Sequence, residues 1–189
     1  MEQIAILASG KGSNADRLCS HFKHHPSARI RLIACDREMA GVYDIARAHN
    51  IPAIHLSKEL RTHPERLLEL LREEGVTFIV LAGYLRLIPK AIVDAYPKRI
   101  INLHPALLPK FGGKGMHGMH VHDAVAAAGE KETGITIHYV NEHYDEGDII
   151  AQFSTPLSSG VTADEIAHLI AGLEAKHFPA VVEEVVTNV

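Results

Sequence analysis

The sequence predicts an α/β protein of Rossmann-like, three-layer architecture, in which helices cover both faces of a mixed, mostly parallel sheet. Short apolar runs alternate with helical patterns through the first hundred residues. These runs are apolar along their length and closely connected, as in parallel strands covered on both faces. Near the C-terminal end, two more apolar runs are joined by a loop alone, so we expect them to pair antiparallel.

The first half is predicted to contain five strands separated by helices. The strands are expected at residues 4–8, 30–36, 51–56, 78–82 and 99–103. A Gly-rich turn at 9–14 leads into the first helix, which is expected to run to about His25. The next helices are expected at 42–49, from Pro64 onward, and at 89–96. Pro64 suits a first helical turn, and four leucines between 67 and 71 supply an apolar face.

The second half begins with a loop at 105–120 that is rich in Gly, Pro and Met. We expect a helix at 121–128, strands at 134–140 and 149–153, and a final helix at 163–186. The length of 189 residues fits one domain, residues 1–189.

Composition disfavours several classes of protein. The net charge of −4 argues against a nucleic-acid or anionic-membrane surface, and no apolar run approaches membrane-spanning length. Cys19 and Cys35 form no CxxC motif, so two free thiols in a reducing cytoplasm are expected. The N-terminus, with an acid at position 2, reads as a first strand and not as a signal peptide.

The turn after the first strand, residues 10–14 (GKGSN), has the character of a phosphate cradle. Glycines let the backbone approach a ligand, and the free amides of a helix N-terminus favour an anion. With Ala15 and Asp36 the stretch also matches a dinucleotide fingerprint, which stays open as a rival. Ser13 and Asn14 favour a monophosphate, although either could be a plain helix cap.

A second site is predicted where the fifth strand ends, in the stretch INLHP. Asn102 and His104 are two residues apart, so their side chains point to one side of the sheet. An amide can stabilise an oxyanion, and an imidazole can move protons near neutral pH. A carboxylate from the later acidic turn could assist the imidazole, and spacing leaves Asp145, Glu146 and Asp148 open.

Three histidines, His117, His120 and His122, lie within six residues and could in principle bind zinc. No cysteine lies near them, so we favour a loop that contacts a ligand and expect no metal.

Taken together, these motifs resemble the phosphoribosylglycinamide formyltransferase (GAR transformylase) family, within the formyltetrahydrofolate-using superfamily. The resemblance covers residues 4–179. The segments that show the resemblance are 8–14 (ASGKGSN), 80–88 (VLAGYLRLI), 101–111 (INLHPALLPKF), 132–152 (ETGITIHYVNEHYDEGDIIAQ) and 173–179 (LEAKHFP). The resemblance implies transfer of a formyl group from 10-formyltetrahydrofolate to the amine of glycinamide ribonucleotide, without a metal, in purine synthesis.

Carried over residue by residue, the resemblance assigns catalysis to Asn102, His104 and Asp145, which resolves the choice of acid. It also implies that the single domain has two halves. Residues 1–100 form the phosphate-binding half, and residues 101–189 form the catalytic and folate-binding half. The implied ribonucleotide contacts are Gly12, Ser13, Asn14 and Glu174, and the implied folate contacts are Arg86, Leu87, Ile88, Asn141, Glu142, His143 and Tyr144.

Two departures from the family pattern stand out. The family often has a lysine or glutamine aimed at the phosphate where this chain has Ala171, and we hypothesise that Lys11 supplies the contact. The loop at 114–120 is longer than in many relatives, and we place the family's histidine pair on His120 and His122.

Other readings explain less of the sequence. Formyltetrahydrofolate hydrolase shares the catalytic residues but usually has an N-terminal regulatory domain, whereas this chain opens on its first strand. Methionyl-tRNA formyltransferase needs a C-terminal nucleic-acid-binding domain and a basic surface. A nicotinamide-dependent oxidoreductase, or a non-catalytic binding module, would leave Asn102, His104 and Asp145 without a role. Monomer and homodimer both stay open.

Overall fold

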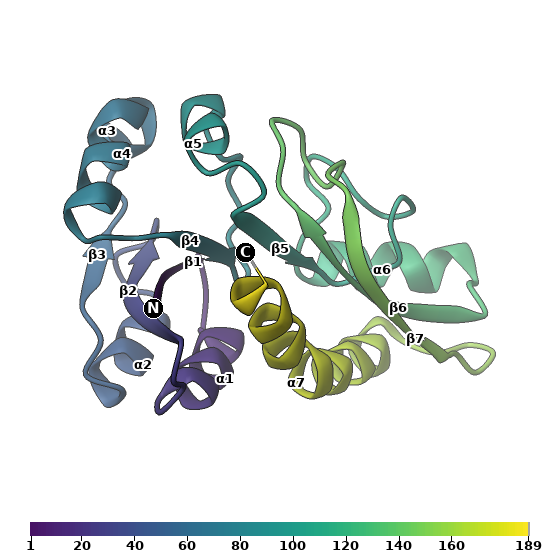
Figure 1. Cartoon of the computed structure of the whole chain (residues 1–189). Helices are drawn as coiled ribbons and strands as arrows, with labels where there is room; N and C mark the ends of the chain where they lie inside the picture. The colour runs from purple at the N-terminus through teal and green to yellow at the C-terminus, as the bar shows by residue number, and fades with distance from the viewer. Residues whose placement is uncertain (189) are drawn as a thin grey trace.

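The computed structural model describes residues 1–188 as a seven-stranded sheet flanked by helices (Figure 1). The strands are β1 (Glu2–Ala8), β2 (Ala28–Cys35), β3 (Ala53–His55), β4 (Phe78–Leu81), β5 (Ile100–His104), β6 (Glu132–Tyr139) and β7 (Ile149–Pro156). The helices are α1 (Ser13–Phe22), α2 (Val42–Ala48), α3 (Lys58–Thr62), α4 (Pro64–Glu73), α5 (Lys90–Ala95), α6 (Met119–Ala128) and α7 (Ala163–Thr187).

The strand order is β3-β2-β1-β4-β5-β6-β7. Strands β1 to β5 pair in parallel, whereas β6 is antiparallel to both β5 and β7. The chain leaves β1 toward β2 on one side and returns to β4 on the other, so the order reverses between β1 and β4. Ligands on such sheets bind beyond the carboxyl ends of the strands at this reversal. The predicted mixed α/β fold is confirmed.

Two apolar cores fill the spaces between the three layers. One lies under α1, α2, α6 and α7 and includes Leu18, Phe78 and Phe178, which are all fully buried. The other lies under α4 and α5 on the opposite face of the sheet and includes Leu71 and Ile92. Alternation along β5 matches the prediction, because Ile101 and Leu103 enter the first core and leave the intervening residues to the other face.

The C-terminal helix α7 fixes the first helix in place. It begins with a capping box, in which Thr162 and Glu165 satisfy each other's backbone N–H groups. Further along, Glu183 accepts hydrogen bonds from His21 at 2.6 Å and from His25 at 3.1 Å. These contacts join the end of α1 to α7, which crosses beside it in Figure 1.

Some element boundaries differ from the prediction. Helix α1 ends at Phe22 and not near His25, because Pro26 disfavours helical backbone at the residue before it. The His25 ring instead accepts the backbone N–H of Ala28 at 3.1 Å and shapes the turn into β2. The short helix α3 was not predicted, since its five residues bury no side chain and so leave no apolar pattern.

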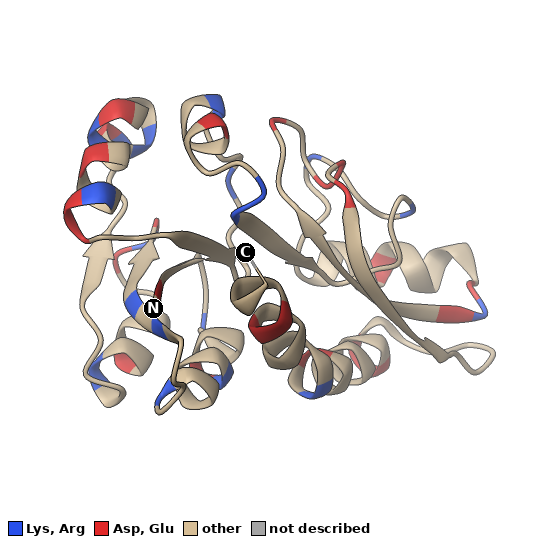
Figure 2. Cartoon of the chain, in the orientation of Figure 1, with Lys and Arg blue, Asp and Glu red and all other residues tan. Residues whose placement is uncertain are grey.

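Charged residues of both signs are interspersed along α3, α4 and α7 and around the loops (Figure 2). Within residues 1–188, no helix combines the length and apolar character needed to cross a bilayer.

Candidate active site

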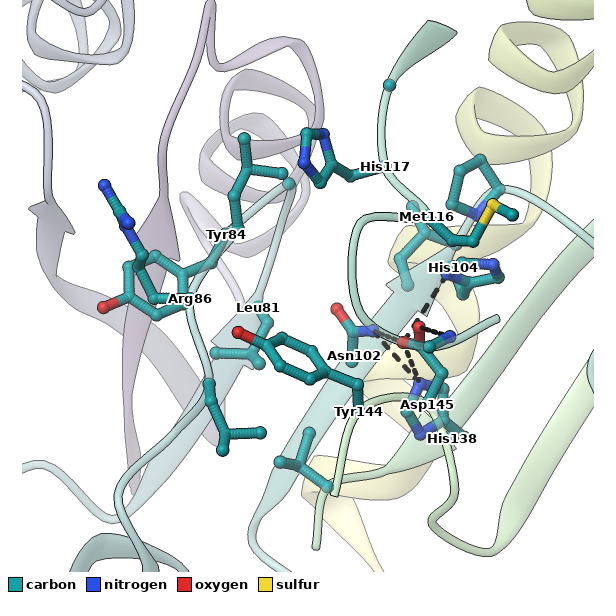
Figure 3. Close-up of a pocket in the computed structure, with 18 of the residues that line it drawn as sticks. Leu81, Tyr84, Arg86, Asn102, His104, Met116, His117, His138, Tyr144 and Asp145 are labelled. Atoms are coloured by element: carbon teal, nitrogen blue, oxygen red, sulfur yellow. Dashed lines mark hydrogen bonds and ion pairs between the residues drawn. The ribbon is translucent and has the colours of Figure 1, made fainter. Parts of the chain in front are cut away.

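A cavity of about 460 Å³ opens at the carboxyl ends of β4 and β5. Its wall is formed by the end of β4 and the loop after it, the end of β5, the loop before α6, the end of β6 and the turn after it, and one residue each from α1, α6 and α7. Asn102, His104 and Asp145 all line it, and they lie close together in Figure 3. The strand and the β6–β7 turn thus bring together the three residues that the sequence analysis singled out.

The imidazole of His104 is buried, with 3% of the residue exposed. Its Nε2 donates to the backbone carbonyl of Phe111 at 2.8 Å, and since a carbonyl only accepts, the ring proton sits on Nε2. Its Nδ1 lies 3.5 Å from Oδ1 of Asp145. Burial lowers the pKa of His104 below its usual value, against the opposing pull of Asp145 and the Phe111 carbonyl. A lowered pKa favours the neutral ring, in which Nδ1 carries no proton and lies beside a carboxylate.

Asp145 is held by several groups at once. Its Oδ2 accepts the backbone N–H of Gly113 at 2.9 Å, and its Oδ1 accepts from the amide of Asn102 at 3.4 Å. Burial alone would raise the pKa of Asp145, but the neighbouring His138, the charge interaction with His104 and the Gly113 N–H keep it below the usual range. Asp145 also has a left-handed backbone (φ 57°), a conformation that Asp and Asn tolerate better than most residues.

His138 on β6 is a member of this cluster that the sequence analysis missed. Its Nδ1 donates to the carbonyl of Tyr139 at 2.8 Å, so its Nε2 is an acceptor. Asn102 donates to that Nε2 at 3.0 Å. The β5–β6 register pairs Asn102 with His138, which explains their contact. The alternation in the segment 134–139 (GITIHY) could have indicated His138, because Thr136 and His138 are polar positions on one face of an otherwise apolar strand.

The Gly-rich turn leads directly into α1, as predicted. Gly12 caps the helix with φ 86°, and among residues 1–188 no side chain accepts a hydrogen bond from the free amides of the first turn. A methyl group at position 12 would lie 2.8 Å from the Val42 side chain, so glycine is required by space as well as by backbone. Ser13 begins the helix, and the exposed Lys11 precedes it.

Two residues of the predicted ribonucleotide site that are far apart in the sequence lie in contact. Asn14 on α1 donates its amide N–H to Glu174 on α7 at 3.0 Å, and both residues line the cavity. Burial raises the pKa of Glu174 above its usual value, while Asn14 and the charge of Arg17 oppose that rise.

The predicted folate contacts lie on two loops that face each other. Arg86, Leu87, Ile88, His143 and Tyr144 line the cavity. Asn141 and Glu142 lie on the second loop outside that lining, where Asn141 accepts the backbone N–H of His143 at 2.9 Å.

Asp36, the acid of the alternative dinucleotide fingerprint, is paired with another side chain of the protein. Arg86 donates to its carboxylate at 2.9 Å. Although burial alone would raise the pKa of Asp36, the hydrogen bonds from Arg86 and Ser9 hold it below the usual range. This pairing fixes the loop after β4 to the end of β2 and gives Asp36 a structural role.

Of the three neighbouring histidines, His117 lies in the loop before α6, whereas His120 and His122 lie on the helix itself, which begins at Met119. His117 and His122 line the cavity, whereas His120 is exposed and its ring packs edge-on against His117 at 5.6 Å. His122 is buried, and its Nδ1 has no hydrogen-bond partner within the described chain. Across residues 1–188, no group of three or more His, Cys, Asp or Glu side chains is arranged to hold a metal ion.

Comparison with known proteins places this site in a family context. Residues 2–182 match the formyl transferase family model. The phosphoribosylglycinamide formyltransferase of Bacillus subtilis is 36% identical, over 97% of this chain and 94% of that protein. The chloroplastic enzyme of Arabidopsis thaliana is 40% identical over 96% of this chain and 64% of that protein.

Solved structures agree with the sequence comparison. The crystal structure of glycinamide ribonucleotide transformylase 1 from Geobacillus kaustophilus has a TM-score of 0.89 at 34% identity, covering 98% of this chain and 99% of that one. The chain spans 64% and 60% of the length of the two plant relatives that it matches.

Proposed function

The chain belongs to the formyl transferase family, and we propose that it transfers the formyl group of 10-formyltetrahydrofolate to the amine of glycinamide ribonucleotide. The products would be formylglycinamide ribonucleotide and tetrahydrofolate, a step of purine (IMP) biosynthesis. One observation carries the proposal: a single cavity joins the cluster of Asn102, His104 and Asp145 to the Asn14–Glu174 pair. A transfer between two bound molecules needs this continuity, because the amine must reach the formyl carbon.

In this proposal the ribonucleotide binds at the α1 side of the cavity. Its phosphate would take the free backbone amides at Gly12, Ser13 and Asn14, with Lys11 as a further candidate contact. Glu174 would accept hydrogen bonds from the ribose hydroxyls. The absence of a capping side chain on the first turn of α1 supports this assignment, since those amides are free for an anion.

The folate would lie between the two facing loops. Backbone groups of residues 86–88 and 141–144 would satisfy the donors and acceptors of its flat ring, while the apolar side chains of Leu87 and Ile88 pack nearby. The location of Arg86, His143 and Tyr144 along the cavity supports this assignment.

The chemistry begins with attack of the ribonucleotide amine on the formyl carbon. The carbonyl electrons move to oxygen, giving an oxyanion, and the amine loses a proton to the unprotonated Nδ1 of His104. Asp145, 3.5 Å from that nitrogen, stabilises the resulting imidazolium. The protonated ring stabilises the oxyanion. The oxyanion electrons then re-form the carbonyl, the bond from carbon to N10 breaks, and the ring returns the proton to N10 of the folate. This scheme uses no metal.

Asn102 would donate an N–H to the oxyanion. In the resting structure its amide nitrogen points toward His138 and Asp145, as Figure 3 shows. Donation to the substrate therefore requires the amide to release one of these partners or to turn over when the formyl group binds. Because the longer contact, to Asp145 at 3.4 Å, is the weaker one, it is the partner that the amide releases at least cost.

The test follows the absorbance change on deformylation of a 10-formyl folate (or its dideaza analogue), with and without glycinamide ribonucleotide. Turnover that depends strictly on the ribonucleotide is expected. Folate release at the same rate without it would mean hydrolysis and would overturn the proposal. The His104→Asn variant serves as the control, since it keeps a polar side chain but cannot shuttle the proton.

A further inference from the structure

Arg17 on α1 is a half-buried arginine whose only side-chain hydrogen bond within residues 1–188 goes to a neutral amide. Its Nη1 donates to Oδ1 of Asn14 at 2.7 Å. By contrast, the half-buried Arg31 and Arg99 each pair with a glutamate, at 2.9 Å and 3.0 Å. Since a guanidinium has five N–H donors, Arg17 has four others to offer.

The position of Arg17 places this charge beside the predicted phosphate cradle. Side chains on a helix lean toward its N-terminus, which brings the guanidinium back to Asn14, in the first turn of α1. Asn14 in turn donates to Glu174. The three side chains form a continuous chain of hydrogen bonds from Arg17 through Asn14 to Glu174, and the last two of them line the cavity.

On α7, the residue one turn before Glu174 is Ala171, which has only a methyl group. Lys11 is exposed, and its side chain makes no hydrogen bond or ion pair within the described residues. Arg17 is therefore the positive side chain that the fold itself anchors next to Asn14.

The charges of the site call for such a cation. A phosphate monoester carries close to two negative charges at pH 7. It would share the cleft with the carboxylate of Glu174, and the Asp16 carboxylate lies in the same first turn of α1. His49 contacts Asp16 at 2.6 Å, so that acid already has a partner. Within residues 1–188, Glu174 has only the neutral amide of Asn14 at hydrogen-bond distance, and the nearby charge of Arg17 opposes the rise of its pKa.

We propose that Arg17 binds the 5′-phosphate of the ribonucleotide and so takes the place of the cation that α7 lacks at Ala171. This inference rests on the proposed function. The planar guanidinium can donate two parallel N–H groups to a phosphate, which a lysine at the same position cannot do. Arg17 would thereby favour phosphorylated over unphosphorylated substrate, while Glu174 remains free for the ribose.

The test compares Arg17→Gln with wild type, using Lys23→Gln as a control that removes a charge from the far end of the same helix. The KM for glycinamide ribonucleotide is expected to rise about 10- to 100-fold in Arg17→Gln, as for the loss of a hydrogen bond to a charged group. The folate KM should stay unchanged. With glycinamide riboside, which lacks the phosphate, wild type and Arg17→Gln should have equal KM values.

A pH profile separates phosphate binding from a merely structural role. The wild-type KM for the ribonucleotide should fall as pH rises through about 6, where the phosphate loses its second proton. In Arg17→Gln this dependence should be shallower. A ribonucleotide KM within about twofold of wild type, or an equal rise for the riboside, would overturn the proposal. A rise in Lys11→Gln alone would overturn it too, because Lys11 would then be the cation.

Failure of the proposed function gives a different pattern. If wild type shows no ribonucleotide-dependent transfer, binding of ribose 5-phosphate is measured by calorimetry on wild type and Arg17→Gln. Weaker binding to the variant would support an anion site at Arg17, and equal binding would refute it.

Discussion

Replacing Asp145 by asparagine tests the proposed mechanism most directly, because the change alters charge with almost no change in shape. Asn tolerates the left-handed backbone at this position (φ 57°), whereas Ala would add strain. One carboxylate oxygen becomes an NH₂ group. Whichever way the new amide turns, it directs a donor at a donor, either the Gly113 N–H or the Asn102 amide.

The size of the effect follows from the contacts. The variant loses the charge interaction between Asp145 and His104, whose Nδ1 lies 3.5 Å from the carboxylate and becomes protonated in the proposed mechanism. The contact with Asn102 is not counted, because the proposed mechanism releases it when the formyl group binds. One interaction with a charged group contributes about 1.5–3 kcal/mol, so kcat should fall by about one to two orders of magnitude.

The assay is ribonucleotide-dependent deformylation of the 10-formyl folate, measured across pH. Asp145 raises the pKa of His104 against the larger, opposite effect of burial, so removing its charge lowers that pKa further. The part of the kcat profile that reports His104 should therefore move to lower pH in Asp145→Asn. The unfolding temperature should fall somewhat, because a donor now faces a donor, and it is measured to show that the variant is folded at the assay temperature. A kcat within about threefold of wild type in the folded variant would refute the role given to the carboxylate.

Two further predictions concern stability. Gly147→Ala should lower the free energy of unfolding in urea by about 1–3 kcal/mol, because the added methyl would overlap the carbonyl oxygen of Tyr139. Gly172→Ala is the control, since a methyl group there meets no atom within 4 Å, and a loss in Gly147→Ala no larger than in this control would contradict the prediction. Glu183→Gln should lower the Tm at neutral pH, because hydrogen bonds from its two histidine partners hold the pKa of Glu183 below its usual value. This contribution is present above about pH 4.3 and is lost as pH falls through the lower folded-state pKa, so a Tm difference that persists unchanged to pH 3 would be evidence against it.

Much of the fold could be predicted because its strands are apolar along their length and its helices are amphipathic. The same pattern made Asn102 and His104 conspicuous, since each interrupts an apolar strand. His138 was harder to find because its role depends on the register between β5 and β6, which pairs it with Asn102. Register follows from side-chain fit over the whole sheet and is not written in either strand alone.

The backbone groups that contact the site residues could not be predicted from the sequence. The carbonyl of Phe111 sets the tautomer of His104, and the N–H of Gly113 holds Asp145. Every residue carries such groups, so nothing in the sequence distinguishes these two. Only the path of the loop after β5 brings them to the site. The partner of Arg86 was similarly hidden, because Asp36 lies 50 positions earlier and fitted a different motif equally well.

The hydrogen bond between Asn14 and Glu174 spans 160 positions of the chain, which has a consequence for synthesis on the ribosome. The Gly-rich turn emerges first, and its partner on α7 emerges 160 positions later. The nascent chain can thus form its parallel strands while half of the proposed ribonucleotide site is still missing. Once α7 docks, any ligand that bridges the two helices favours the docked state by mass action. Newly made protein would then be stabilised by the proposed ribonucleotide substrate at the step in which α7 docks.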